Sequence, residues 1–120
     1  MYAVIRRYEG VERETLLEVA RRSHAGFRAR LMDRPGFVAY ELVVGDDSVA
    51  AISVFESWVV AEETNQLARR WVQDNLAEFD LPVPQVTAGE IYSEEGLPAP
   101  FATGRSAKVG RALQNEGDVT

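Results

Sequence analysis

The spacing of apolar residues alternates along this chain between a helical and a strand pattern. The order of these patterns restricts the fold more strongly than any other feature of the sequence. Two segments repeat apolar residues every three or four positions, as amphipathic helices do, and four shorter ones are rich in strand-favouring Val, Ile, Tyr and Phe. The helical segments are 12–32 and 57–79, and the strand segments are 2–9, 37–44, 49–56 and 86–92. The order βαββαβ predicts an α+β, ferredoxin-like fold, with both helices on one face of an antiparallel four-stranded sheet.

Turn-forming residues separate these segments. Arg34-Pro35-Gly36 predicts the end of the first helix, because the residue before a proline avoids the α region and glycine permits a sharp turn. The link 45–48 predicts an antiparallel hairpin, and Ser57 is suited to cap the second helix. Gly89 inside the last strand predicts a bulge or a close backbone approach.

Both faces of the predicted sheet carry apolar residues. A solvated face would alternate apolar and polar side chains, whereas several positions here have apolar sequence neighbours. These positions are Ala3, Ile5, Ala39, Val43, Ala50, Ile52 and Val54. We therefore expect a second copy to pack on the free face, giving a homodimeric α/β barrel. The domain is expected over residues 1–93, and 94–120 either forms an arm over the partner or is a disordered tail.

The composition limits which binding partners and which cell compartment we expect for this protein. Thirteen Lys and Arg residues against 19 Asp and Glu give a net charge of −6, which opposes binding to nucleic acid or to anionic lipid. No apolar run approaches the ~18 residues of a membrane span, and the first residues lack a signal-peptide pattern. We expect a cytoplasmic protein with neither nucleic acid nor membrane as partner.

The residue inventory argues against several cofactors. The chain has no cysteine and one histidine, so thiolate sites are excluded and no dedicated metal site is expected. Neither a dinucleotide-binding glycine motif nor a Walker motif occurs. Any reaction is therefore expected to be independent of a bound cofactor or to use a loosely held external molecule.

Two polar residues on the predicted apolar stripes are the candidate catalytic groups. His24 is the only side chain whose unperturbed pKa lies near neutrality, which suits it to the role of a general base. A lone histidine on such a stripe is more often a hydrogen-bonded core residue. Asn65 would stabilise an oxyanion, and its amide needs a partner, supplied either by a ligand or by neighbouring protein or water.

Four further residues are candidates for binding the substrate. Arg6 and Tyr8 share one face of the first strand, and Tyr40 lies on the second. They would bind a phenolate or carboxylate, although a polar seam between subunits explains them equally well. Trp71 on the second helix would form a pocket wall or belong to the core.

Two short motifs, Arg34-Pro35-Gly36-Phe37 and Val54-Phe55-Glu56-Ser57, give a family resemblance. With this layout, the chain resembles the antibiotic biosynthesis monooxygenase family over about residues 2–93. The resemblance implies a dimeric α/β barrel with a pocket between helices and sheet in each subunit. It also implies cofactor-independent oxygenation of an aromatic polyketide or quinol, in a superfamily that includes haem-degrading enzymes and proteins without known activity.

Residue by residue, the resemblance gives two readings of function. Phe55 stands where oxygenases of the family carry a tryptophan, which makes it a candidate substrate contact; Ala51 and Ala61 stand at their asparagine and tyrosine. Asn65 falls on the histidine ligand of the haem-degrading relatives, which disfavours that chemistry because an amide is a poor iron ligand. One hypothesis is a monooxygenase acting on a small aromatic molecule. The alternative is a non-catalytic dimeric binding or accessory module.

Overall fold

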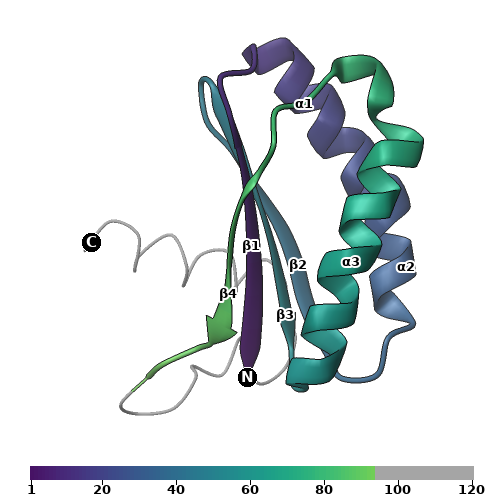
Figure 1. Cartoon of the computed structure of the whole chain (residues 1–120), viewed down its shortest axis with the longest axis vertical. Coiled ribbons are helices and arrows are strands. Elements are labelled where there is room, and N and C mark those ends of the chain that lie inside the picture. The colour runs from purple at the N-terminus through teal and green to yellow at the C-terminus, as the bar shows by residue number, and fades with distance from the viewer. Residues whose placement is uncertain (94–120) are drawn as a thin grey trace.

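The structure, a computed structural model, describes residues 1–93. Its four-stranded antiparallel sheet has the order β2-β3-β1-β4 (Figure 1). The strands are β1 (Tyr2–Glu9), β2 (Phe37–Val44), β3 (Ser48–Phe55) and β4 (Gln85–Glu90). This topology confirms the predicted ferredoxin-like fold. The expected C-terminal arm or tail at 94–120 lies outside the described residues.

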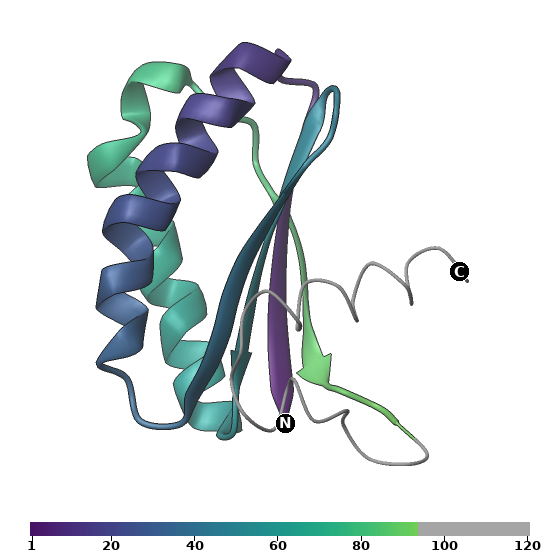
Figure 2. The ribbon, with the colours of Figure 1, turned by 180° about the vertical axis from the view of Figure 1, so that it is seen from behind.

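All helices lie on one face of the sheet, as the two opposite views show (Figures 1 and 2). The first helical segment comprises α1 (Arg13–Arg22), a π-helical turn η1 (Ser23–Phe27) and α2 (Arg28–Met32). The second comprises α3 (Trp58–Asn75) and the short 3₁₀ turn η2 (Ala77–Phe79). Within residues 1–93, no helix is long and apolar enough to cross a membrane.

Local signals place the ends of these elements as expected. The Ser57 hydroxyl accepts a hydrogen bond from the Val60 amide at 3.4 Å, which caps the first turn of α3. Gly36 adopts a φ of 74° in the turn before β2, a conformation that glycine tolerates best. The Gly45 amide donates to the Ser48 carbonyl at 2.7 Å and closes the β2–β3 hairpin. These three predictions are confirmed.

The register assigns each strand residue to one of two faces. Val4, Arg6 and Tyr8 of β1 alternate toward the helices. On the opposite face a separate apolar cluster forms from β2 and β3, with Met1, Ala3, Ile5 and Ile91 packed against it. Its buried members are Val38, Ala39, Ile52 and Val54. The prediction of apolar residues on both faces is therefore confirmed.

The irregularity of the sheet lies in a different strand from the one predicted. β4 pairs with β1 in continuous register through Gly89, which lies opposite Ala3, so the predicted bulge at Gly89 is wrong. The register shift occurs instead in β2, between Phe37 and Ala39. It brings the Phe37 ring to the helix side, 6.0 Å between centroids from Phe55.

Candidate functional site

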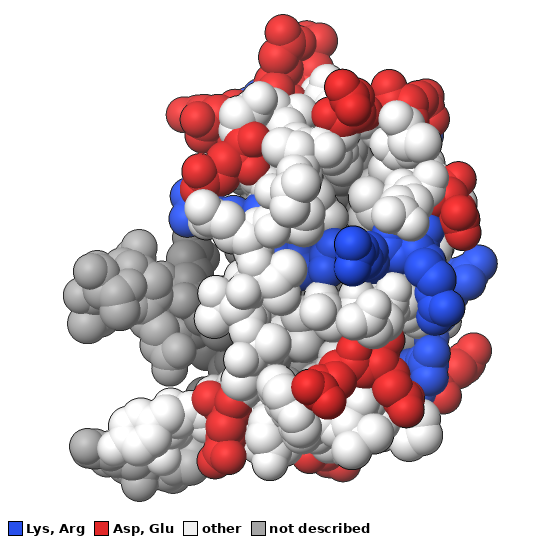
Figure 3. Space-filling model, viewed as in Figure 1, with Lys and Arg blue, Asp and Glu red and all other residues white. Residues whose placement is uncertain are grey.

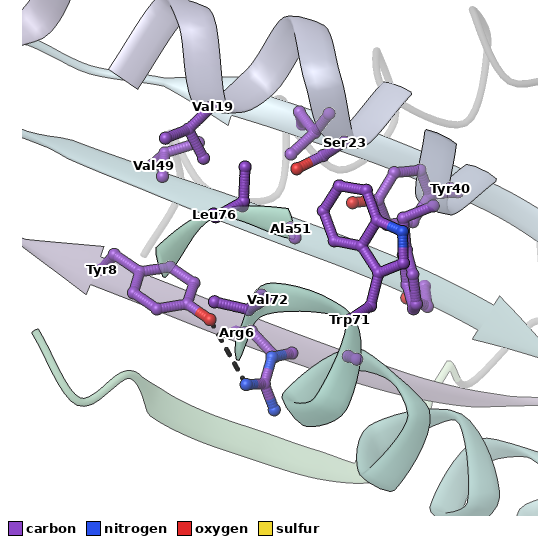
Figure 4. Close-up of a pocket in the computed structure, with 14 residues that line it drawn as sticks. Arg6, Tyr8, Val19, Ser23, Tyr40, Val49, Ala51, Trp71, Val72 and Leu76 are labelled. Atoms are coloured by element: carbon purple, nitrogen blue, oxygen red, sulfur yellow. Dashed lines mark hydrogen bonds between the residues drawn. The ribbon is translucent and has the colours of Figure 1, made fainter. Parts of the chain in front are cut away.

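A narrow cavity lies between the sheet and the two helical segments (Figure 4). Its volume is ≈ 30 Å³, room for one or two water molecules or one diatomic gas molecule. Apolar and aromatic side chains form most of the wall, and Arg6, Tyr8, Ser23, Tyr40 and Ser53 supply its polar atoms. An aromatic ring does not fit this volume unless the walls move.

Three aromatic rings form one end of the cavity. Phe27 lies 5.6 Å from Tyr40 and 5.5 Å from Trp71 between ring centroids, in edge-to-face and tilted geometries that aromatic pairs favour. Burial raises the pKa of Tyr40 above its ordinary value, and a hydrogen bond with Ser23 partly opposes this shift. Tyr40 is therefore uncharged at physiological pH, and its hydroxyl oxygen accepts the hydrogen bond from Ser23.

Gly26 in the π turn makes room for the Trp71 indole. A Cβ atom at Gly26 would lie 2.9 Å from Cζ2 of Trp71, closer than van der Waals contact allows. The indole is 7% exposed and packs directly against the helix backbone at this point. The position of this cavity wall therefore depends on residue 26 being a glycine, which has no side chain.

Arg6 forms the opposite end of the cavity. Its side chain is 9% exposed, and it donates from Nη1 to Asn65 Oδ1 at 2.7 Å and from Nη2 to the Tyr8 hydroxyl at 3.3 Å (Figure 4 shows the second bond). Both acceptors are neutral. No carboxylate in residues 1–93 pairs with Arg6, although several exposed arginines have acidic partners there. Arg6 is thus a buried positive charge without a counter-charge in the described part of the chain.

The Arg6 guanidinium also faces a second, open space. A groove of ≈ 280 Å³ runs between α3 and β4, and Arg6 and Asn65 line it together with Val86. Arg6 therefore lies between a narrow, largely apolar cavity and a groove large enough for a small ligand. The remaining N–H groups of the guanidinium can hold an anionic oxygen at this boundary.

His24 does not belong to this site. It lies on the exposed side of η1, whereas Ser23 and Phe27 are buried. The Arg28 amide donates to the Ser23 carbonyl, which is the wider hydrogen-bonding pattern of a π turn. The predicted place of His24 on the buried stripe is therefore wrong, because the inward face runs through Val19, Ser23 and Phe27.

The other predicted residues divide into three groups. Arg6, Tyr8, Tyr40 and Trp71 line the cavity. Asn65 is half-buried outside it, and the partner that its amide needed is the Arg6 guanidinium. Phe55 is completely buried beside Phe37 and does not line the cavity, which places it in the core.

Sequence reasoning missed Ser23, Phe27 and Gly26 as parts of the site. Val19, Ser23 and Phe27 recur at intervals of four residues, a signal that the assignment of His24 to the apolar stripe overlooks. Nothing in the sequence marked Gly26 as the contact point of Trp71, because the two are far apart along the chain. Among residues 1–93, no cluster of His, Cys, Asp or Glu is suited to hold a metal ion.

The fold is shared with solved oxygenase structures. A monooxygenase from the gene ActVA-Orf6 of Streptomyces coelicolor, determined with the ligand nanaomycin D, superposes with a TM-score of 0.63 at 14% identity, over 81% of this chain and 91% of that one. SnoaB from Streptomyces nogalater, a cofactor-independent oxygenase, superposes with a TM-score of 0.54 at 23% identity, over 81% and 95% of the two chains.

These likenesses define the class of fold. The chain has the ferredoxin-like fold of antibiotic biosynthesis monooxygenase-type proteins, as the two motifs in its sequence suggested. No protein-family model and no curated protein sequence matches it. At this level of identity the comparison establishes the architecture alone, so the function must be argued from the residues of the site.

Proposed function

We propose that this protein is a cofactor-independent monooxygenase that oxidises a small acidic aromatic molecule, such as a phenol or quinol. The single observation that carries the proposal is Arg6, a buried guanidinium without a carboxylate partner in residues 1–93. A buried unpaired charge is costly for the folded protein, so its retention points to an anionic ligand that completes it. The shared fold with oxygenases supports the same class of reaction.

The substrate binds in the groove with its acidic oxygen at Arg6. The positive charge favours the phenolate over the phenol, so the substrate ionises more readily at this position than in water. Asn65 and the Tyr8 hydroxyl accept hydrogen bonds from Arg6 and hold the guanidinium in place. His24 has no part in this step because its side chain is exposed away from the cavity.

Dioxygen occupies the narrow cavity beside Arg6. The cavity volume of ≈ 30 Å³ and its largely apolar wall suit a small apolar molecule better than a ring. The substrate anion transfers one electron to dioxygen, and the superoxide formed passes Arg6 to combine with the substrate radical as a peroxide on a ring carbon that bears hydrogen. The peroxide takes up the proton released on ionisation, and loss of water from this carbon leaves a carbonyl, so one oxygen atom enters the product and the other leaves as water.

Oxygen uptake with a panel of quinols and anthrone-like compounds tests this proposal. We expect uptake above the uncatalysed rate, and a fall in turnover of about 10²–10³-fold in Arg6→Met, because the group that stabilises the anion is lost. Arg70→Met is the matched control, since Arg70 is exposed on α3 and outside both spaces. Equal uptake in wild type and Arg6→Met would refute the assignment.

A non-catalytic binding module is the second candidate. Ala51 lines the cavity where the resemblance places an asparagine of the oxygenases, which favours a site that binds without reacting. Such a module would bind the same aromatic anions in an Arg6-dependent manner but give no uptake of oxygen. The two measurements together, binding and uptake, therefore separate the two functions.

We also propose a homodimer formed through the sheet face opposite the helices. The apolar cluster of Ala39, Ile52 and Val54 on that face supports it, since a monomer gains little from apolar residues on both faces. Light scattering after size-exclusion chromatography is expected to give twice the chain mass of 13.3 kDa. A mass of a single chain at micromolar concentration would contradict the dimer.

A further inference from the structure

The groove between α3 and β4 contains a second arginine that the proposed reaction does not use. Arg69 lines the groove together with Arg6 and Asn65. Asn65 and Arg69 lie one helical turn apart on the same side of α3, and Val86 of β4 is the cross-strand partner of Arg6. The topology therefore brings two arginines from distant parts of the chain to one groove.

These two arginines make the groove positive within an acidic protein. Figure 3 shows a band of basic side chains crossing the face between β4 and α3, with acidic side chains above and below it. Arg69 is exposed and forms no ion pair within residues 1–93. Glu62 and Glu63 line the neighbouring hollow beside Trp58. The groove is therefore positive, whereas the neighbouring hollow is negative.

The opposite wall of the groove is apolar and open to solvent. Val83 is 92% exposed and Val86 is 42% exposed, and Pro84 lies between them. Exposed apolar residues beside a pair of arginines suit a ligand with a flat apolar body and an anionic group. A simple inorganic anion would leave this wall uncovered.

We infer that Arg69 forms a carboxylate subsite, so that the ligand class is an aromatic hydroxy acid. This inference rests on the proposed function, in which Arg6 holds the acidic hydroxyl oxygen. The ring lies against Val83 and Val86, and the carboxylate accepts hydrogen bonds from the Arg69 guanidinium at the outer end of the groove. The pair of arginines then favours a ligand with a second negative charge.

Fluorescence titration with two matched probes, 2-naphthol and 6-hydroxy-2-naphthoate, tests the inference. We expect the hydroxy acid to bind wild-type protein about tenfold more tightly, because one additional charge-assisted hydrogen bond forms. Arg69→Gln should remove this preference and leave naphthol binding unchanged. Arg70→Gln is the control, because Arg70 is the exposed neighbour that does not line the groove.

The possible results separate the subsite from the proposed function. Equal binding of the two probes to wild type, or equal losses in the Arg69 and Arg70 variants, would overturn the subsite and leave the Arg6 assignment intact. Binding of both probes that does not change in Arg6→Met would overturn the proposed function. Displacement of the hydroxy acid by acetate at equal concentration would overturn the role of the aromatic body.

Discussion

The two ends of the cavity differ in how their buried groups are satisfied. At the aromatic end, Phe27, Tyr40 and Trp71 are buried against one another, with every ring contact intramolecular. At the cationic end, Arg6 and Tyr8 are equally buried, but the guanidinium has only neutral partners in the described residues. The first end stabilises the folded chain, whereas the second keeps a charge that a ligand would satisfy.

This difference shows where stability and function are separated in a small domain. Apolar contacts at the aromatic end contribute to folding without a ligand. A buried arginine without a counter-charge is neutral or unfavourable for folding, so it is retained for another reason. Substitutions at the two ends should therefore change different measurements.

The largest effect on stability is expected at Phe27. Phe27→Ala should lower the free energy of unfolding by about 3–5 kcal/mol, because a ring that is 4% exposed is lost and a cavity remains. Urea denaturation followed by circular dichroism measures the change. A loss below about 1 kcal/mol would mean that this end is not the main source of stability that its packing indicates.

Gly26→Ala should have the next largest effect. The new methyl group would lie 2.9 Å from Trp71 Cζ2, so the indole must shift toward the cavity, and overpacking of this kind costs about 1–3 kcal/mol. Trp71 fluorescence and thermal denaturation report the shift and the cost. A more stable variant would contradict the contact, since alanine is otherwise the better helix former.

Tyr40→Phe should cost about 1 kcal/mol near neutral pH, from the hydrogen bond with Ser23 that is lost. The substitution should also change how the free energy of unfolding depends on pH in the alkaline range. The pKa of Tyr40 is raised in the folded protein, so above pH about 10 the unfolded chain releases the proton first and stability falls as the pH rises. Urea denaturation from pH 8 to 11 is expected to show a smaller alkaline loss in the variant. The same loss in both proteins would show that Tyr40 does not titrate in this way.

The smallest effect on stability is expected at Arg6, although its effect on binding is the greatest. Arg6→Met keeps most of the side-chain volume and removes the unpaired charge, so the free energy of unfolding should change by less than about 1 kcal/mol or rise. Urea denaturation beside the Phe27 variant gives the direct comparison. A loss above about 3 kcal/mol would mean that Arg6 is a structural residue.

Much of the fold was accessible from the sequence because it depends on local chemistry. The π turn could not be predicted from the sequence, and it places the His24 side chain on the exposed side of the helix. A prediction from an ideal helical period assigns His24 to the stripe with Ala20 and Phe27, whereas the structure directs Ser23 inward in its place. The stripe through Ser23 and the stripe through His24 are offset by one residue along the helix. Only the packing of the helix on the sheet determines which of them is buried.

The sequence by itself determined the order of the elements, their turns and the helix cap at Ser57, since each depends on residues close together in the chain. It also marked Arg6, Tyr8, Tyr40 and Trp71 by side-chain type. Only the tertiary structure decided that Arg6 lies between a narrow cavity and a wider groove, with Asn65 as its partner. The physical reason is that burial and charge pairing arise between segments distant in sequence, and no local pattern records them.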